Sequence, residues 1–592
     1  MPQTRDPVVT FSVKVDGRPL PLEVWLCLVH VVVDQRVRLP AMASLAFHDP
    51  ERKILDEPML ALGSTLEVFA AQDVGKPVKL FDGEVTALEV EYDSGGMLSV
   101  VRGLDRSHKL THGSRTRTFL NMTYADVVRK VGQEAGLRVE ADATQPVLEY
   151  VLQYNQSNLA FLHDLAAEVG YDLWVEGNTL KFKKPKPAVQ APAPGTVQAS
   201  DPLQLVVGEN LRSLRATATS TGQVATAEVR GWDVKEKREI VVTKQRIAPQ
   251  GASNGVPATQ TTPSSGSRVA VSTPYGVHGE VETASEAFAQ DLASSRIELE
   301  GVALGEPALQ AGTTVSVGEA GERFNGRYTV TAARHVFEPA EGYRTEFSVS
   351  GRADRTLRGL VDGAVWRDQA GAHGSIDGVV PAIVTNNKDP LDLGRVKVKF
   401  PWLTDEHESA WARPVQLIAG NGYGAAIIPE INDEVLVAFE QGDPNRPYII
   451  GSLYNGKDRP QKTTGQIIKS DKVAQRRIET PTLNRLVFFD EKGTKEGITL
   501  RTGDDKFFLD LDKTNTKVVL SSNGDVTIEA KTGKVTITSQ NDMTFKSNNN
   551  LTLEGATKTT IKGAQVEVAA QGTMKLQANG PLEAKGAIIK LN

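Results

Sequence analysis

The C-terminal part of the chain, residues 524–592, carries apolar residues in pairs that repeat almost every eight positions. The pairs are Val526 and Ile528, Val535 and Ile537, Met543 and Phe545, Leu551 and Leu553, Val566 and Val568, and Met574 and Leu576. Their first members are nine, eight, eight, fifteen and eight residues apart, and Thr559 and Ile561 form a weaker pair in the long gap. Residues two apart on a strand point to the same side, so each repeat predicts a strand with one apolar face.

Such a ribbon cannot close a core alone, because its apolar face has nothing in the same chain to pack against. Stacked repeats from several chains can bury the paired residues against their counterparts. The alternative is an ordinary meander in a β-sandwich, which seldom keeps so strict a period. We therefore predict an intertwined β-helix over residues 524–592, with the twelve paired residues as its core.

Composition limits the remaining possibilities. A chain of 592 residues with 40% apolar residues exceeds one core and predicts several domains. Its formal net charge of −6 and lack of long single-sign blocks give no nucleic-acid footprint. The only cysteine, Cys27, excludes internal disulfides and favours assembly in reducing cytoplasm. The opening residues contain no apolar signal core and no run is long enough to span a bilayer, so we expect no general secretion signal and no membrane helix.

Strand signals dominate the first third, which makes the expected fold mainly β. β-Branched runs broken by Gly, Pro and Asp-Gly turns predict a first barrel over 1–105. An α+β insertion over 106–185 should follow, because Thr123 can cap one helix while Ser157 caps and Gly170 ends another. The Pro/Ala-rich stretch 186–202 predicts an extended linker.

The middle of the chain returns to strands. Residues 203–355 predict a second barrel, with a helix in which Thr283 and Glu286 fit a capping box. A linker over 356–377 should precede five or six short strands at 378–456. Their Gly, Pro and Asp turns are consistent with a small Greek-key barrel of the oligonucleotide/oligosaccharide-binding (OB) type. A polar linker and short strands leading into the spike complete 457–523.

The small barrel is the most specific part of the sequence. Its segments "GRVKVKFPW", "WARP" and "GYGAAIIPEINDEVLVAFEQGDPNRPYIIGSLYNG" resemble the barrel of VgrG-type spike proteins, the central needles of contractile injection systems and counterparts of phage tail hub and spike proteins. "YNQSNLAFLHDLAAEVGYDLWVEGNTLKF" and "RLVFFDEKGTKEGITLRTGDDKFFLDLD" are similar to the family's hub insertion and spike lead-in. The first hundred or so residues match less clearly, which favours phage-derived extracellular or cytoplasmic injection particles over a type VI secretion spike.

The resemblance implies a homotrimer that punctures a target membrane. Two tube-like barrels per chain would then match a hexameric inner tube, and baseplate proteins would be further partners. The end residues Ile588, Ile589, Leu591 and Asn592 would contact a PAAR-like tip protein, although burial of the three apolar ones in the trimer core is an equal alternative. The protein would be made in the cytoplasm, built into the particle, and then released outside the cell or injected.

No residue pattern predicts catalysis, a cofactor or a metal. "GASNG" places Ser253 in a nucleophile-elbow pattern, but no helix can follow it. "GNGYGA" from Gly420 precedes strands and therefore offers no helix N-terminus for a pyrophosphate. His108 and His112 stand four apart without a further ligand. We expect a non-enzymatic protein; a spike with peptidoglycan hydrolase activity and a trimeric receptor-binding fibre are the less favoured alternatives.

Overall fold

The computed structural model describes residues 9–72, 76–93, 96–194, 201–245, 250–256, 263, 265–350, 376–403 and 408–590. The chain divides into two compact units, Met1–Pro460 and Gln461–Asn592, which are described separately. Strands greatly outnumber helices in both units, so the predicted mainly β fold is confirmed. Within the described residues, no helix combines the length and the apolarity needed to cross a bilayer.

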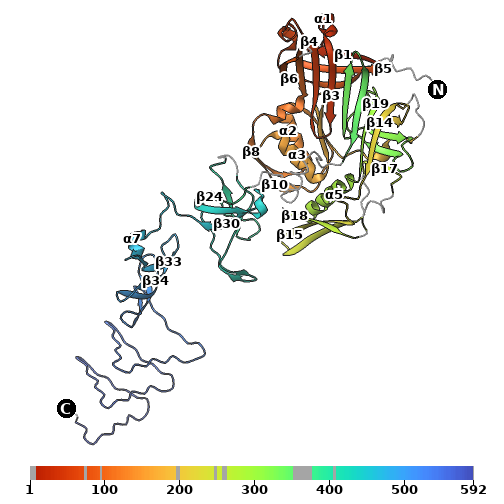
Figure 1. Ribbon diagram of the computed structural model, residues 1–592. Coiled ribbons are helices and arrows are strands. Elements are labelled where there is room, and N and C mark those ends of the chain that lie inside the picture. Colours follow the sequence, from red (N-terminus) through yellow and green to blue (C-terminus); the bar gives the residue numbers. More distant parts are fainter. Residues whose placement is uncertain are drawn as a thin grey trace. The chain divides into compact units, whose positions relative to one another are not determined.

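One antiparallel eleven-stranded sheet forms the centre of the first unit (Figure 1). In sheet order its strands are β14 (Leu211–Ala218), β19 (Ile297–Leu304), β23 (Gly342–Val349), β22 (Ala332–Glu338), β3 (Leu28–Arg36), β4 (Leu39–His48), β7 (Gly96–Asp105), β6 (Val78–Asp93), β5 (Thr65–Gln72), β1 (Val9–Val15) and β2 (Arg18–Pro19). Strands β3 and β22 pair directly, with Val33 opposite His335 and Arg36 opposite Ala332. The regions predicted as two barrels therefore share one hydrogen-bonded sheet.

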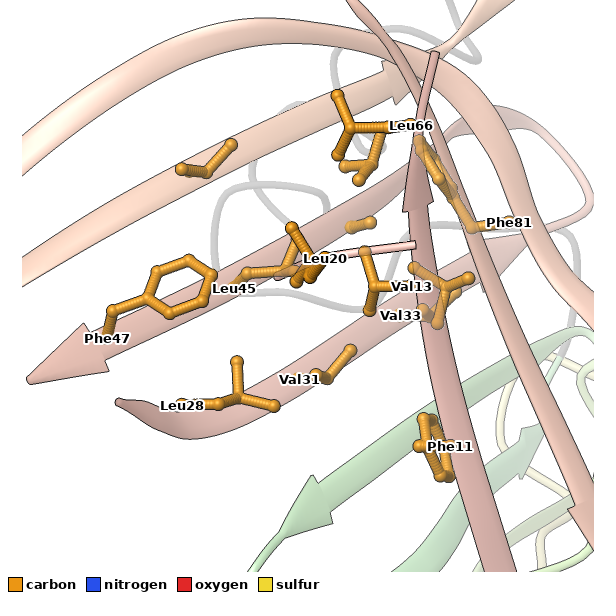
Figure 2. Packing of buried hydrophobic residues seen from close by; sticks show 14 of the residues in the cluster. Phe11, Val13, Leu20, Leu28, Val31, Val33, Leu45, Phe47, Leu66 and Phe81 are labelled. Carbon is orange, nitrogen blue, oxygen red and sulfur yellow. The ribbon is translucent and has the colours of Figure 1, made fainter. Parts of the chain in front are cut away.

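The core of the first half also crosses this joint. Figure 2 shows Phe11, Leu45 and Phe47 among other apolar side chains of this core, and each of the three is at most 5% exposed. Phe11 stacks on Phe337 with ring centroids 4.7 Å apart and meets the edge of Tyr343 at 4.8 Å. Both partners lie on β22 and β23, so aromatic packing joins the two halves as well as backbone pairing does. Three short helices contribute to this core: α1 (Leu22–Leu26), η1 (Ile54–Asp56) and η2 (Pro58–Leu60). A fourth, η3 (Arg106–Thr111), places Leu110 in the core of the insertion.

The second half adds two small sheets and a helix. The sheets contain β13 (Gln204–Val206), β20 (Thr314–Gly318), β21 (Gly326–Thr329) and β17 (Ala252–Asn254), and β16 (Arg238–Gln245), β15 (Thr226–Asp233) and β18 (Ser267–Tyr275). Helix α5 (His278–Ser294) packs on β15 and β16. The predicted capping box at Thr283 and Glu286 is wrong: Glu280 accepts the Gly276 and Val277 amides, so the helix begins earlier. Thr283 lies inside the helix and donates to the Gly279 carbonyl.

The insertion has the two predicted helices, α2 (Tyr124–Glu134) and α3 (Asn158–Val169). Its strands are β8 (Arg115–Met122), β10 (Leu148–Gln156), β9 (Arg138–Ala141), β11 (Asp172–Glu176) and β12 (Thr179–Lys183), followed by η4 (Ala188–Gln190). Thr123 accepts a hydrogen bond from the Asp126 amide, and Ser157 accepts one from the Ala160 amide, which confirms both caps. Gly170 ends α3 with a left-handed φ of 68°.

The OB region contains one five-stranded sheet. Its strands, in sheet order, are β25 (Lys397–Lys399), β24 (Val379–Asn386), β29 (Glu434–Phe439), β30 (Pro447–Ser452) and β26 (Arg413–Pro414). Between them lie the hairpin of β27 (Ala419–Gly420) and β28 (Tyr423–Gly424) and the turn η5 (Glu440–Gly442). Val384, Val398, Val435 and Val437 are fully buried in its core, as the alternation of their strands requires.

The second unit begins with an antiparallel meander. It contains α7 (Thr464–Ile467), the hairpin of β31 (Ile468–Lys469) and β32 (Lys472–Val473), and a sheet of β33 (Gln475–Glu479), β34 (Arg485–Glu491), β35 (Lys495–Arg501), β36 (Phe507–Asp512) and β37 (Lys517–Ser522). After this sheet, residues 523–590 contain neither helix nor paired strand, and Figure 1 draws them as a plain trace.

Candidate functional site

The backbone of the repeat segment is not paired with any other strand of its own chain. In this described stretch, residues 524–590 make no backbone-to-backbone hydrogen bond and belong to no sheet. All of them are exposed. Extended chain normally satisfies its amides and carbonyls in a ladder, and a single ribbon leaves both of its edges open. The segment therefore presents hydrogen-bonding groups that another chain can pair with.

The predicted core residues are just as open. The exposed fractions of the twelve paired side chains run from 44% for Met543 to 73% for Leu576. Leaving this many large apolar side chains in water is unfavourable by about 25 cal/mol for each Å² of apolar surface. The sequence identified these residues, and the single chain gives them no core.

One member of the repeat was missed. Leu582 lies eight residues after Met574 and is 67% exposed, so it continues the series of first members. Its partner position holds the small Ala584, which made the pair hard to recognise. The spacing of eight was the signal that could have found it.

The C-terminal end is apolar as well. Ile588 is 78% exposed and Ile589 is 54% exposed. The other two predicted tip residues, Leu591 and Asn592, lie outside the described residues. Two adjacent exposed isoleucines at the end of the ribbon form an apolar surface that water solvates poorly.

The meander above the repeat has an apolar face that the sequence analysis did not predict. Two rows cross its strands in register: Ile478, Leu486, Leu500, Leu509 and Leu520, and Phe488, Ile498, Leu511 and Val518. Most of these side chains are well exposed, with Leu500 at 57% and Val518 at 69%. Alternation along β34 to β37 was the available signal. Exposed apolar residues thus line the meander from β33 onward and continue into the repeat.

The patterns considered for catalysis do not assemble into a site. Ser253 lies on strand β17, opposite Arg327 of β21. The rings of His108 and His112 pack edge to face, with centroids 5.6 Å apart. Gly420 lies in the hairpin of β27 and β28, and the residues directly after this hairpin form no helix. Among the described residues, no group of three or more His, Cys, Asp or Glu side chains could hold a metal ion.

Family models match two parts of the chain. Residues 380–454 match the injector OB domain of type VI secretion systems and phage baseplates. Residues 5–338, more than half of the chain, match the Alg8 N-terminal domain. The chain therefore belongs to the Alg8 N-terminal domain family, and its residues 380–454 form an OB domain similar to the injector domain of type VI secretion systems and phage baseplates.

Curated relatives agree with this placement. The chain is 25% identical over 433 residues to the type VI secretion system spike protein VgrG3 of Vibrio cholerae, covering 67% of this chain and 39% of the relative. It is 26% identical over 438 residues to the actin cross-linking toxin VgrG1 of Vibrio cholerae, covering 69% and 37%. The chain thus spans well under half the length of these relatives.

A solved structure shares the fold. The chain resembles one from the half-lidded PdpA-VgrG complex of Francisella, with a TM-score of 0.52, 8% sequence identity and coverage of 87% of this chain and 88% of that one. At this level of identity the likeness concerns the fold alone.

Proposed function

We propose that this chain is the hub and central spike of a contractile injection system and that it works as a homotrimer. The observation that carries the proposal is the repeat segment, whose paired apolar residues are exposed and whose backbone makes no backbone-to-backbone hydrogen bond within one chain. Three copies wound into a β-helix would bury the pairs and complete the ladders at once. A lone chain would have to order this segment at about 1–2 kcal/mol per residue in backbone entropy with no core to offset it.

The first half would form the hub. Its two strand-rich halves would act as two tube-like barrels, so that three chains offer six similar positions to a hexameric inner tube protein. The joined sheet supports this proposal, because pairing of β3 with β22 fixes the two halves in one orientation. Baseplate proteins would bind around the hub, and the OB barrels would gather the three chains around one axis.

The far end would meet the target. Exposed Ile588 and Ile589 would be covered by a PAAR-like tip protein, and the stiff trimer would be driven through the target membrane when a sheath contracts. The protein would be made in the cytoplasm and leave the cell with the particle or its contents. We propose a mechanical, non-enzymatic role, in a phage-tail-like particle or a type VI secretion system.

The mass of the purified chain tests the proposal most directly. Light scattering should give about three times the 64.0 kDa mass of one chain at micromolar concentration. The same preparation should bind rings of the inner tube protein of the same injection system. A monomer at that concentration would contradict the spike assignment, and a trimer that never binds tube rings would contradict the hub assignment.

A further inference from the structure

The Gly-Asp-Pro-Asn-Arg-Pro turn at Gly442–Pro447 joins β29 to β30 in the OB region and reaches the hub half of the same chain. It is well ordered by its own backbone. The Arg446 amide donates to the Asp443 carbonyl at 2.9 Å, and the Glu440 amide donates to the Arg446 carbonyl at 3.0 Å. The backbone of the turn therefore fixes the directions in which its side chains project.

Asn445 contacts the edge of a strand in the insertion. Its Oδ1 accepts a hydrogen bond from the backbone amide of Leu152 on β10 at 2.9 Å. Among the strands of the described residues, β10 pairs with β8 alone, so one of its edges is free of strand pairing. The carboxamide is oriented by Asp443, whose Oδ1 accepts from the Asn445 side-chain amide at 2.8 Å and from its backbone amide at 2.9 Å. The donor end of Asn445 is thus fixed, and its oxygen must point at Leu152.

Arg446 contacts the start of helix α5. Its guanidinium lies 3.4 Å from Glu280 Oε2, the oxygen that also accepts the Gly276 and Val277 amides. Gly276 leaves the space that the guanidinium fills, because a Cβ there would lie 2.4 Å from Arg446 Nη1. Any larger residue at that position would displace the arginine. The carboxylate that begins α5 therefore also receives the OB turn.

The rest of this junction is hollow. A cavity of about 570 Å³ adjoins the turn and is lined by Tyr124, Tyr150, Tyr275, Trp411 and Tyr448 among others. Tyr150 donates to the Glu408 carbonyl at 3.2 Å, and Tyr154 packs against the OB core. A dry, close-packed interface would spread its energy over many contacts. Here a small number of polar contacts border a cavity, so the loss of one contact should weaken the junction more than it would in a close-packed interface.

We infer that the Gly442–Pro447 turn is the docking element that holds the OB barrel against the hub half of its own chain, with Asn445 and Arg446 as its positioning residues. Its use in transmitting force from hub to spike rests on the proposed function. The docking itself does not, because every contact described lies within one chain.

Hydrogen exchange of the full-length protein tests this inference at a named atom. Replacing Asn445 with Ala should speed exchange of the Leu152 amide about tenfold, because that amide loses its acceptor. The matched control is Asn455→Ala, since Asn455 bonds Glu434 and Asp458 inside the OB region. That change should leave β10 exchange at the parent rate.

Two further measurements keep the result decisive. Exchange within β29 reports whether the OB barrel itself is intact. If Asn445→Ala speeds exchange within β29, Arg446→Met is used instead. This second variant should speed exchange in β10 and in the first turn of α5. Unchanged β10 exchange in a variant whose β29 stays protected would overturn the inference. Light scattering on the same samples keeps the two ideas separate, because a monomeric parent would contradict the proposed function and leave the exchange comparison valid.

Discussion

Replacing Ile537 with Asp distinguishes a shared core from a solitary ribbon. In the single chain Ile537 is 61% exposed, and its neighbour Thr536 is exposed as well. If the chain stayed alone, Asp at either position would change little, since most surface substitutions fall within about 0.5 kcal/mol. If three chains bury the pairs, the two positions should differ sharply, because adjacent residues on a strand face opposite ways.

The exposed fraction sets the size of the effect. Full burial of an isoleucine side chain contributes about 1.5–3 kcal/mol, and roughly three-fifths of the Ile537 side chain is still available for burial on association. Its loss should therefore cost about 1–2 kcal/mol per chain, or about 3–6 kcal/mol per trimer. Three carboxylates around one axis in a dry core add desolvation and repulsion to this figure, so it is a lower bound.

Thermal unfolding at matched protein concentration provides the assay, with mass followed by light scattering. Ile537→Asp should melt well below the parent and lose trimer, whereas Thr536→Asp should melt with the parent. Concentration must be fixed because the stability of an assembled trimer depends on it. Equal sensitivity at the two positions would refute the reasoning and remove the basis for a β-helix.

Three other outcomes are expected. Changing Ile588 and Ile589 together to Asp should abolish copurification of a tip protein while the trimer mass stays constant; retained binding would place the tip contact elsewhere. Burial lowers the pKa of His335 from 6.5 to about 3, so between pH 7 and pH 5 the unfolded chain takes up a proton that the folded chain does not. The free energy of unfolding of the first half, measured by urea denaturation, should therefore fall by about 2 kcal/mol over this pH range. The variant His335→Gln should flatten this pH dependence. The carboxylate of Asp389 is 3% exposed and accepts hydrogen bonds from Arg395. Changing Asp389 to Ala should therefore lower the free energy of unfolding of the OB region by about 3–5 kcal/mol, measured by thermal melting. An unchanged melting temperature would contradict this prediction.

Local signals predicted local structure well. Ser157 and Gly170 lie at the two ends of α3, where short-range capping chemistry places them. The prediction at Thr283 was wrong because Thr and Glu three residues apart match the capping-box pattern. The helix in fact begins after Val277, which has no capping side chain, and the Glu280 carboxylate accepts the Val277 amide instead. A residue type can mark a helix start, but the surrounding backbone decides which candidate is used.

Long-range pairing was beyond the reach of the sequence. Nothing around Val33 or His335 indicates that β3 and β22 become neighbours, because the pairing depends on the path of the whole first half. The repeat could be predicted because its eight-residue period lies within one continuous segment and needs no knowledge of long-range pairing. The Asn445 contact with Leu152 was likewise hidden, because a backbone amide carries no residue-specific signal.

The joint between β3 and β22 also has a consequence for synthesis on the ribosome. Arg36 emerges early, but its partner Ala332 follows only after about half of the chain has been translated. Until then β3 keeps an open edge, the kind of strand edge that recruits wrong neighbours in a crowded cell. Nascent chains truncated shortly before Ala332 should accordingly bind chaperones more strongly than chains that extend past Val349.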